Sequence, residues 1–237
     1  MENDIQRQNG VRSAGRSERR RRASRPRGFT LIELLLVMGI MALLLIMAVT
    51  SYQNIGRATQ LDQSVTQLKF AMQFARQWAI TNRVDTWVVF PTSIPDGEFG
   101  GITDMNFRSY GIYTNPRSGS SELVREWTAL PTSVFFDPNP SPSAKNVLRL
   151  TSTRVPGGSQ LPNHLHNQPG VGFSPSGSLV SQITADAPEI YLAEGLRPTH
   201  AGPTVAPRFL SDQPVIHGVQ VYRHTGLVTV TRYGEDG

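Results

Sequence analysis

The sequence predicts an α+β protein in which one long N-terminal helix packs on a C-terminal antiparallel β-sheet domain. Three observations support this prediction. The 64 residues from Arg27 to Phe90 contain no proline, as a long helix requires. Sixteen of the 17 prolines lie from Pro91 onward, where β-like runs alternate with Pro- and Gly-rich loops. The excess basic charge lies in residues 1–28, which separates a basic leader from a nearly neutral body.

Residues 1–28 are rich in arginine and poor in large apolar side chains, so they cannot bury enough surface to fold alone. The 237-residue chain has 23 basic and 18 acidic residues, a net charge of +5 and a pI of about 10.0. The leader holds nine arginines and three acids (+6), which leaves 14 basic and 15 acidic residues (−1) in the remainder. The body therefore attracts polyanions weakly. The absence of cysteine excludes disulfide scaffolds, thiolate metal sites and cysteine nucleophiles.

Residues 29–50 are almost continuously apolar. A helix over 29–49 is roughly 30 Å long at about 1.5 Å per residue, which matches the hydrocarbon core of a bilayer. We therefore expect a transmembrane helix here. Its arginine-rich flank should remain cytoplasmic by the positive-inside rule, which leaves the C-terminal body outside.

Residues 51–83 continue this helix as an amphipathic segment. Apolar side chains recur at steps of three and four, which predicts a helix with one buried face; they are Tyr52, Ile55, Ala58, Leu61, Val65, Leu68, Met72, Ala75 and Ala79, with Phe74, Trp78 and Ile80 widening the stripe. No strong helix breaker separates the two segments, so we expect one helix over residues 30–82.

Residues 84–237 are expected to form an extracytoplasmic β-rich domain. The predicted strands are 84–90, 107–113, 123–130, 134–136, 147–150, 171–173, 189–192, 215–222 and 227–232. The last two, joined by Arg223-His-Thr-Gly226, predict a closing hairpin.

The most specific feature is the junction Arg25-Pro-Arg-Gly-Phe-Thr-Leu-Ile-Glu33. Here the apolar run follows Gly28 directly and contains one acid, Glu33. A secretory signal is cut after its apolar segment, and a twin-arginine signal would place that segment next to the arginines. A carboxylate in a bilayer costs on the order of 2–4 kcal/mol. Glu33 must therefore reach the interface or meet a positive partner, and a cut between Gly28 and Phe29 would create such a partner as an α-amine.

This junction resembles the processing site of type IV pilins and type II secretion pseudopilins. The resemblance implies that a prepilin peptidase cuts after Gly28 and methylates the new N-terminal Phe29. It implies that Glu33 pairs with the N-terminus of a neighbouring subunit during filament assembly. The implied partners are other pseudopilins or pilins, and indirectly the inner-membrane assembly platform with its ATPase. The chain departs from many pilins in having Thr50 in place of a proline and a long, 28-residue leader.

The segments Leu68–Val84, Val171–Gly177 and Val219–Arg232 resemble GspH/FimT-type minor pilins. This implies a minor pseudopilin of the type II secretion pseudopilus, in its initiation or tip complex. The alternative is a minor pilin of a type IV pilus, with possible DNA binding in natural transformation. Either protein would cross the bacterial inner membrane once, with its C-terminal domain in the periplasm. Both machines use the same parts, so the sequence does not choose between them.

Other candidate sites are read as ordinary surface features. Some FimT-type proteins carry an Arg-rich element where this chain has Gly226-Leu-Val-Thr229, so nucleic-acid binding is not expected. We interpret His164 with His166 as a polar loop and Ser174 with Ser176 as a turn. The acids of the 96–104 loop fit a loop as well as a cation site; they are Asp96, Glu98 and Asp104. We predict no enzymatic activity, no cofactor and no metal.

Overall fold

The computed structural model describes residues 29–99, 104–116, 119–140, 144–156, 160–196, 207–210 and 214–234, except for the side chains of 47–58, 96 and 97. The predicted leader, including Gly28, lies outside these residues. The chain divides into two units, Met1–Ala48 and Val49–Gly237, and each is described by itself.

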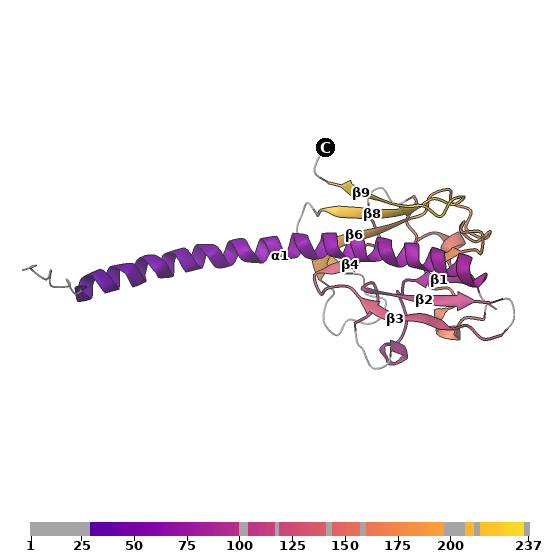
Figure 1. Cartoon of the computed structure of the whole chain (residues 1–237), viewed down its shortest axis with the longest axis horizontal. Helices are drawn as coiled ribbons and strands as arrows, with labels where there is room; N and C mark the ends of the chain where they lie inside the picture. The colour runs from indigo at the N-terminus through magenta and orange to yellow at the C-terminus, as the bar shows by residue number, and fades with distance from the viewer. Residues whose placement is uncertain are drawn as a thin grey trace, which may run out of the picture. The chain divides into compact units, whose positions relative to one another are not determined.

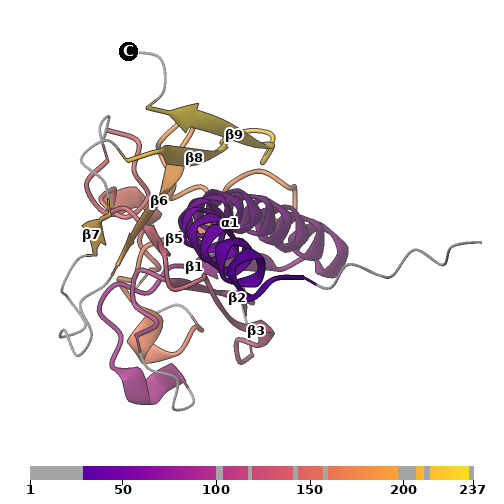
Figure 2. The same ribbon diagram turned by 90° about the vertical axis from the view of Figure 1, so that its left-hand side faces the viewer.

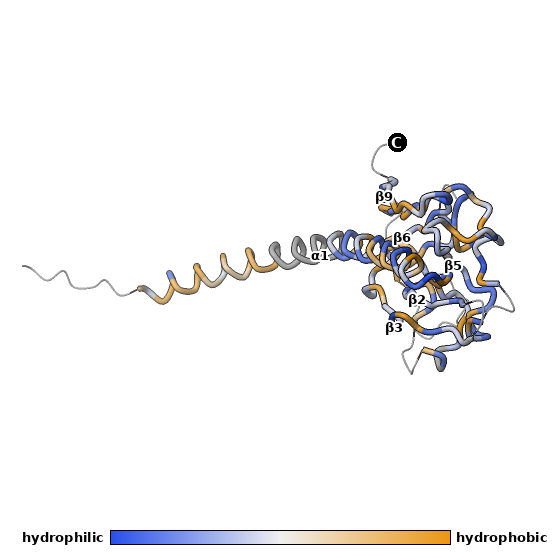
Figure 3. Tube along the Cα trace, turned by 45° about the vertical axis from the view of Figure 1, so that its right-hand side comes forward, coloured by the Kyte–Doolittle hydropathy of each residue, from blue (hydrophilic) through white to orange (hydrophobic). Residues whose placement is uncertain are grey.

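The first unit contains the start of helix α1 (Leu31–Asn82), whose N-terminal part consists mostly of hydrophobic residues, coloured orange in Figure 3. Every large apolar side chain from Leu31 to Ile46 is between 46% and 79% exposed. No helix within the described residues meets the length and apolarity needed to cross a membrane. Membrane insertion of residues 29–50 therefore stays a prediction.

In the second unit, α1 buries the face that the sequence predicts. The stripe Leu61, Val65, Leu68, Met72, Ala75 and Ala79 is at most 4% exposed. The same spacing of three and four residues joins them, so this face supplies the helical side of the core. Phe74, predicted to widen the stripe, is instead 39% exposed, and Phe70 is 63% exposed.

Two antiparallel sheets complete the domain, where the sequence predicts one. The first sheet has the order β3-β2-β1-β5, and its strands are β1 (Asp85–Val89), β2 (Ser109–Asn115), β3 (Leu123–Ala129) and β5 (Gly170–Phe173). The second has the order β4-β6-β8-β9, with β7 paired to β6; its strands are β4 (Val134–Phe136), β6 (Glu189–Leu196), β7 (Arg208–Phe209), β8 (Ile216–Val221) and β9 (Val228–Tyr233). In the described parts of the loops, short 3₁₀ helices occur at Asp96–Phe99, Thr151–Thr153 and Asn163–Leu165.

Within this unit, α1 lies between the two sheets. Figures 1 and 2 both show β8 and β9 on one side of the helix and β2 and β3 on the other. Buried side chains from both sheets join those of the helix in one hydrophobic core. The expected α+β fold, a long N-terminal helix on antiparallel β-structure, is confirmed.

The helix is tied to two turns by one arginine. Arg76 Nε donates to the carbonyl oxygens of Gly177 (2.9 Å) and Thr225 (3.0 Å). Gly177 lies in the turn after β5, and Thr225 lies in the β8–β9 hairpin. Gly226 has a φ of +63°, and a Cβ there would collide with the Gly177 carbonyl. The predicted closing hairpin is confirmed, and Arg76 joins it to the other sheet.

Two local expectations need correction. Residues 147–150 form a turn after an isolated bridge at Asn146, because the backbone N–H groups of Arg149 and Leu150 donate to Asn146. The short strand β7 was not predicted. It consists of two residues paired with β6, and so short a run cannot show the alternation of apolar and polar residues that predicts a strand.

Helix α1 ends on a residue with left-handed backbone. Arg83 follows the last helical residue and has a φ of 55°. This C-terminal position favours glycine, because a Cβ is strained there.

We predict that Arg83→Gly raises the free energy of unfolding by about 1 kcal/mol, because it removes the left-handed strain. Denaturant unfolding of the detergent-purified chain measures this effect. The control Gln77→Gly, at an exposed helical position, should lower the same quantity by about 1 kcal/mol. An equal decrease in the free energy of unfolding from both substitutions would show that Arg83 carries no left-handed strain.

Candidate functional site

The start of α1 is organised by Thr30 and Glu33. The Thr30 backbone N–H and hydroxyl each donate to Glu33 Oε2, both at 3.4 Å. In return, the Glu33 backbone N–H donates to Thr30 Oγ1 at 3.3 Å. The Thr30 carbonyl accepts the first helical bonds, from the N–H groups of Glu33 and Leu34. Together these contacts form a capping box, in which residues N-cap and N3 satisfy each other's backbone donors.

This capping box gives Glu33 a specific place. Its carboxylate lies in the first turn, where the helix dipole favours negative charge. It is exposed, as are Phe29 (80%) and the apolar side chains that follow. The carboxylate is therefore held at the helix end next to residue 29 while remaining accessible to a positively charged partner.

The comparison with family models bears on this N-terminus. Residues 23–49 match the family described as the prokaryotic N-terminal methylation motif. The matched range includes the basic end of the leader, Gly28, Phe29 and the capped Glu33. The chain has a prepilin-type N-terminus. The expected resemblance to type IV pilin-like proteins, drawn from the same residues, is confirmed.

Among solved structures, the minor pseudopilin EpsH from the type 2 secretion system of Vibrio cholerae resembles this chain. The two share 12% sequence identity, and the alignment covers 74% of this chain and 99% of EpsH with a TM-score of 0.41. These values are too low to transfer the function of EpsH. No curated protein sequence matches the chain.

Thr30 was not among the predicted site residues, although the sequence contains a signal for its role. A threonine three residues before a glutamate, at the start of an apolar run, is the sequence signature of a capping box. The first turn of its own helix therefore supplies hydrogen-bond donors to Glu33, besides the interface and the positive partner expected from the sequence.

We predict that Thr30→Ala destabilises the first turn of α1 by about 1 kcal/mol. The substitution removes the Thr30 hydroxyl, which donates to the Glu33 carboxylate and accepts from the Glu33 backbone N–H. Amide hydrogen exchange at Glu33 and Leu34 measures this, in a micelle-bound peptide that starts at Phe29. Thr30→Ser retains the hydroxyl and should keep near-native protection. Unchanged exchange in Thr30→Ala would show that the box does not hold the turn.

The structure brings together one acidic candidate and one histidine candidate from different loops. His164 Nδ1 lies 3.3 Å from Glu98 Oε2; the histidine side chain is partly exposed and the glutamate side chain is exposed. This ion pair does not include His166, and the side chain of Asp96 lies outside the described residues. Within the described residues, no group of three histidine, aspartate or glutamate side chains is arranged to hold a metal ion.

The serine candidates lie in a turn, as the sequence predicts. The Gly177 N–H donates to the Ser174 carbonyl, and Gly177 has a φ of +82°. The hydroxyl oxygens of Ser174, Ser176 and Ser178 lie 2.7–3.0 Å from one another. These hydroxyls are therefore hydrogen-bonded among themselves, as in a polar turn.

A buried carboxylate that sequence reasoning missed stabilises the second sheet. Glu189 is 2% exposed and accepts hydrogen bonds from the hydroxyls of Tyr191 (2.9 Å) and Tyr233 (2.8 Å). Burial, followed by the bond to Glu189, raises the pKa of Tyr233 to about 12. Both tyrosines therefore stay protonated as donors at neutral pH, and the cluster joins β6 to β9.

A second polar contact joins α1 to β8. His217 Nε2 lies 3.6 Å from Asp62 Oδ1, and the histidine side chain is 9% exposed. Burial lowers the pKa of His217 below its ordinary value of 6.5; Asp62 opposes this effect and Arg232 adds to it.

We predict that His217 makes stability depend on pH. At pH values between the lowered folded-state pKa of His217 and 6.5, the unfolded chain binds more protons at this residue than the folded chain does. The free energy of unfolding therefore rises with pH across this window and falls on acidification. His217→Gln should remove this part of the pH dependence in thermal unfolding from pH 7.5 to 5. His164→Gln, at a partly exposed histidine, serves as the control. An unchanged pH profile in His217→Gln would contradict the prediction.

Proposed function

We propose that the chain is a minor pseudopilin, a structural subunit in the initiation or tip complex of a type II secretion pseudopilus. The observation that carries the proposal is the matched methylation motif, with a capped glutamate at the start of an exposed apolar helix. In this role the chain is made as a precursor, and prepilin peptidase cuts it between Gly28 and Phe29 and methylates Phe29. The role is mechanical and requires no catalytic site in the chain.

Before assembly, residues 29–50 anchor the precursor in the inner membrane, with the leader in the cytoplasm and the β-rich domain in the periplasm. The leader's charge of +6 supports this orientation. Cleavage removes that charge and leaves an α-amine on Phe29. The mature side chains then carry −1 in total, and Glu33 is the one charged residue between Phe29 and Val49.

In assembly, Glu33 accepts the positively charged N-terminus of an incoming subunit. The capping box supports this step because it holds the carboxylate at the helix end and leaves it exposed. A charge-assisted bond of about 1.5–3 kcal/mol in a low-dielectric environment is enough to select the register of packing.

We predict that Glu33→Ala leaves cleavage intact but lowers incorporation into sheared filaments about tenfold or more, as expected from losing a bond of this strength. Immunoblots of the membrane and filament fractions measure both quantities. Glu98→Ala removes an exposed acid elsewhere and should assemble normally. Normal incorporation of Glu33→Ala would refute the pairing.

The alternative role is that of a minor pilin in a type IV pilus, with or without DNA binding. The described hairpin gives DNA binding little support, because Arg223 Nη1 donates to the Thr184 carbonyl and the body has a charge of −1. A deletion strain separates the two machines. Loss of protein secretion with pili retained supports the pseudopilin, and the reverse supports the pilin.

A further inference from the structure

Strand β9 forms a free edge of the second sheet. It pairs with β8 on one side, and no strand of the described residues lies on its other side. Figures 1 and 2 both show β9 as the outermost strand of this sheet. All six residues of Val228–Tyr233 pair with β8 without a register shift. Such an edge presents a regular row of backbone N–H and C=O groups to which a further strand can bind.

The register of the hairpin identifies the backbone groups that face this edge. The Tyr222 N–H donates to the Leu227 carbonyl at 3.0 Å, and Val221 lies opposite Val228 in the next pair. Hydrogen-bonded and non-hydrogen-bonded pairs alternate along an antiparallel ladder. The Val221 N–H accordingly donates to the Pro188 carbonyl and not to β9. Every second residue of β9 therefore turns its N–H and C=O away from β8; these residues are Val228, Val230 and Arg232.

The other edges of the two sheets carry the usual protection against pairing. Strand β3 has two register shifts against β2 and exposes the charged side chains of Arg125 and Glu126. Strands β4 and β7 have only three and two residues, and β5 is partly covered because the Val180 N–H donates to the Gly172 carbonyl. Bulges, charges and short strands are the means by which natural sheets block their edges. By contrast, β9 begins with the regular β-branched run Val-Thr-Val-Thr, which favours strand pairing.

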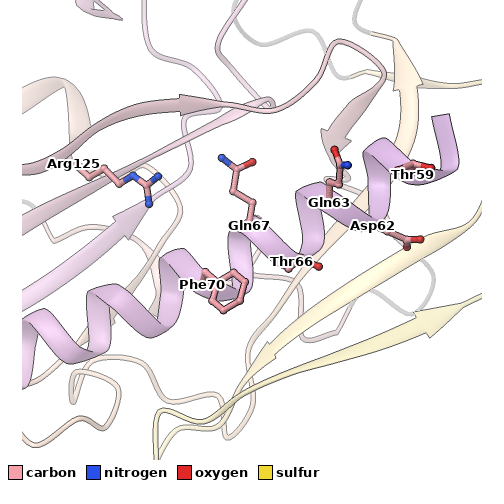
Figure 4. A pocket seen from close by; sticks show the side chains of 7 residues that line it. All are labelled: Thr59, Asp62, Gln63, Thr66, Gln67, Phe70 and Arg125. Carbon is pink, nitrogen blue, oxygen red and sulfur yellow. The ribbon is translucent and has the colours of Figure 1, made fainter. Parts of the chain in front are cut away.

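A hollow beside β9 can receive side chains of an added strand. It measures about 500 Å³, and its lining includes Lys69, Phe70 and Val230. The Phe70 side chain projects from α1 (Figure 4) and is 63% exposed. Because directly opposed residues point to the same face of a sheet, the residue paired with Val230 would extend its side chain toward this hollow. The charges of Asp62, Lys69 and Arg232 at and beside the hollow sum to +1, which favours an acidic residue in the added strand.

We propose that β9 accepts an extended segment of a different protein as an additional antiparallel strand. The main chain of the segment exchanges hydrogen bonds with the outward groups of β9, an apolar side chain enters the hollow beside Phe70, and an acidic side chain lies opposite Arg232. This inference goes beyond the proposed function, and strand binding does not require processing at Phe29.

A second copy of β9 is a poor occupant of this edge. Antiparallel pairing of β9 with itself would point the two α1 helices in opposite directions, because α1 and β9 extend along a similar line (Figure 1). Copies that the same basic leader anchors in one membrane share one orientation. The occupant is therefore a strand from another protein.

A synthetic peptide tests the proposal. The probe is fluorescein-Gly-Thr-Asp-Thr-Val-Thr-Val-amide, in which Asp and the first Val lie opposite Arg232 and Val230. It is titrated into the detergent-purified full chain and followed by fluorescence anisotropy. We expect saturable binding, together with slower hydrogen exchange of residues 227–233 measured by mass spectrometry. A peptide with Lys in place of Asp should bind about threefold more weakly, because it loses the opposite-charge pair.

Val230→Pro tests the role of the main chain. The Val230 N–H faces away from β8, and proline is tolerated on edge strands at such positions. The substitution removes a donor from the free edge, so we expect about tenfold weaker binding. Val230→Thr keeps the N–H and the branched shape, and its affinity should stay within about twofold of the natural chain. Thermal unfolding establishes that both variants are folded.

A matched pair of peptides makes the same test on the unchanged protein, so the test does not depend on the folding of Val230→Pro. N-methylation of the first Val of the probe blocks an N–H that faces β9 and should weaken binding about tenfold. N-methylation of the Thr that follows it blocks an N–H that faces away from β9. This second peptide should bind within about twofold of the unmodified probe.

The proposal is overturned if the probe shows no saturable binding below about 1 mM. It is also overturned if the two N-methylated peptides bind equally well, or if the probe slows exchange in β3 and not in β9. Self-association of the chain that Val230→Pro abolishes would assign this edge to a second copy and would overturn the proposal as well.

Discussion

A carboxylate at the start of an apolar helix needs hydrogen-bond donors or positive charge, and this requirement shapes the N-terminus of the chain. In the structure, Thr30 supplies the donors through its backbone N–H and hydroxyl. The capping box starts α1 at a defined residue and fixes the position of Glu33 relative to Phe29. The same carboxylate, held in place but exposed, is suited to accept an N-terminus from another subunit. Helix initiation and the proposed assembly step thus depend on one side chain.

The rest of α1 serves a different purpose in the second unit. Its stripe from Leu61 to Ala79 closes the core between two sheets, while Arg76 ties the turn after β5 to the β8–β9 hairpin. One face is buried within the domain, and the opposite face leaves Asp62 and Phe70 exposed. A helix with two such faces can belong to a folded domain and to a larger assembly at once.

Sequence patterns predicted the local elements well, because these depend on local chemistry. The proline-free window and the apolar spacing predicted α1, and the turn at Arg223–Gly226 predicted the closing hairpin. The division into two sheets could not be predicted, since it depends on which distant strands pair: β1 joins β5, and β4 joins β6. The contact of His164 with Glu98 likewise arises only when two loops meet. Thr30 could have been predicted from the spacing of its motif.

The proposed function requires that the chain is cut between Gly28 and Phe29. The most direct test is mass spectrometry of the mature N-terminus, on the full chain purified from membranes of the producing bacterium. We expect a polypeptide that begins with N-methylated Phe29 and lacks residues 1–28. A chain that begins with an intact Met1, in cells with active prepilin peptidase, would contradict it.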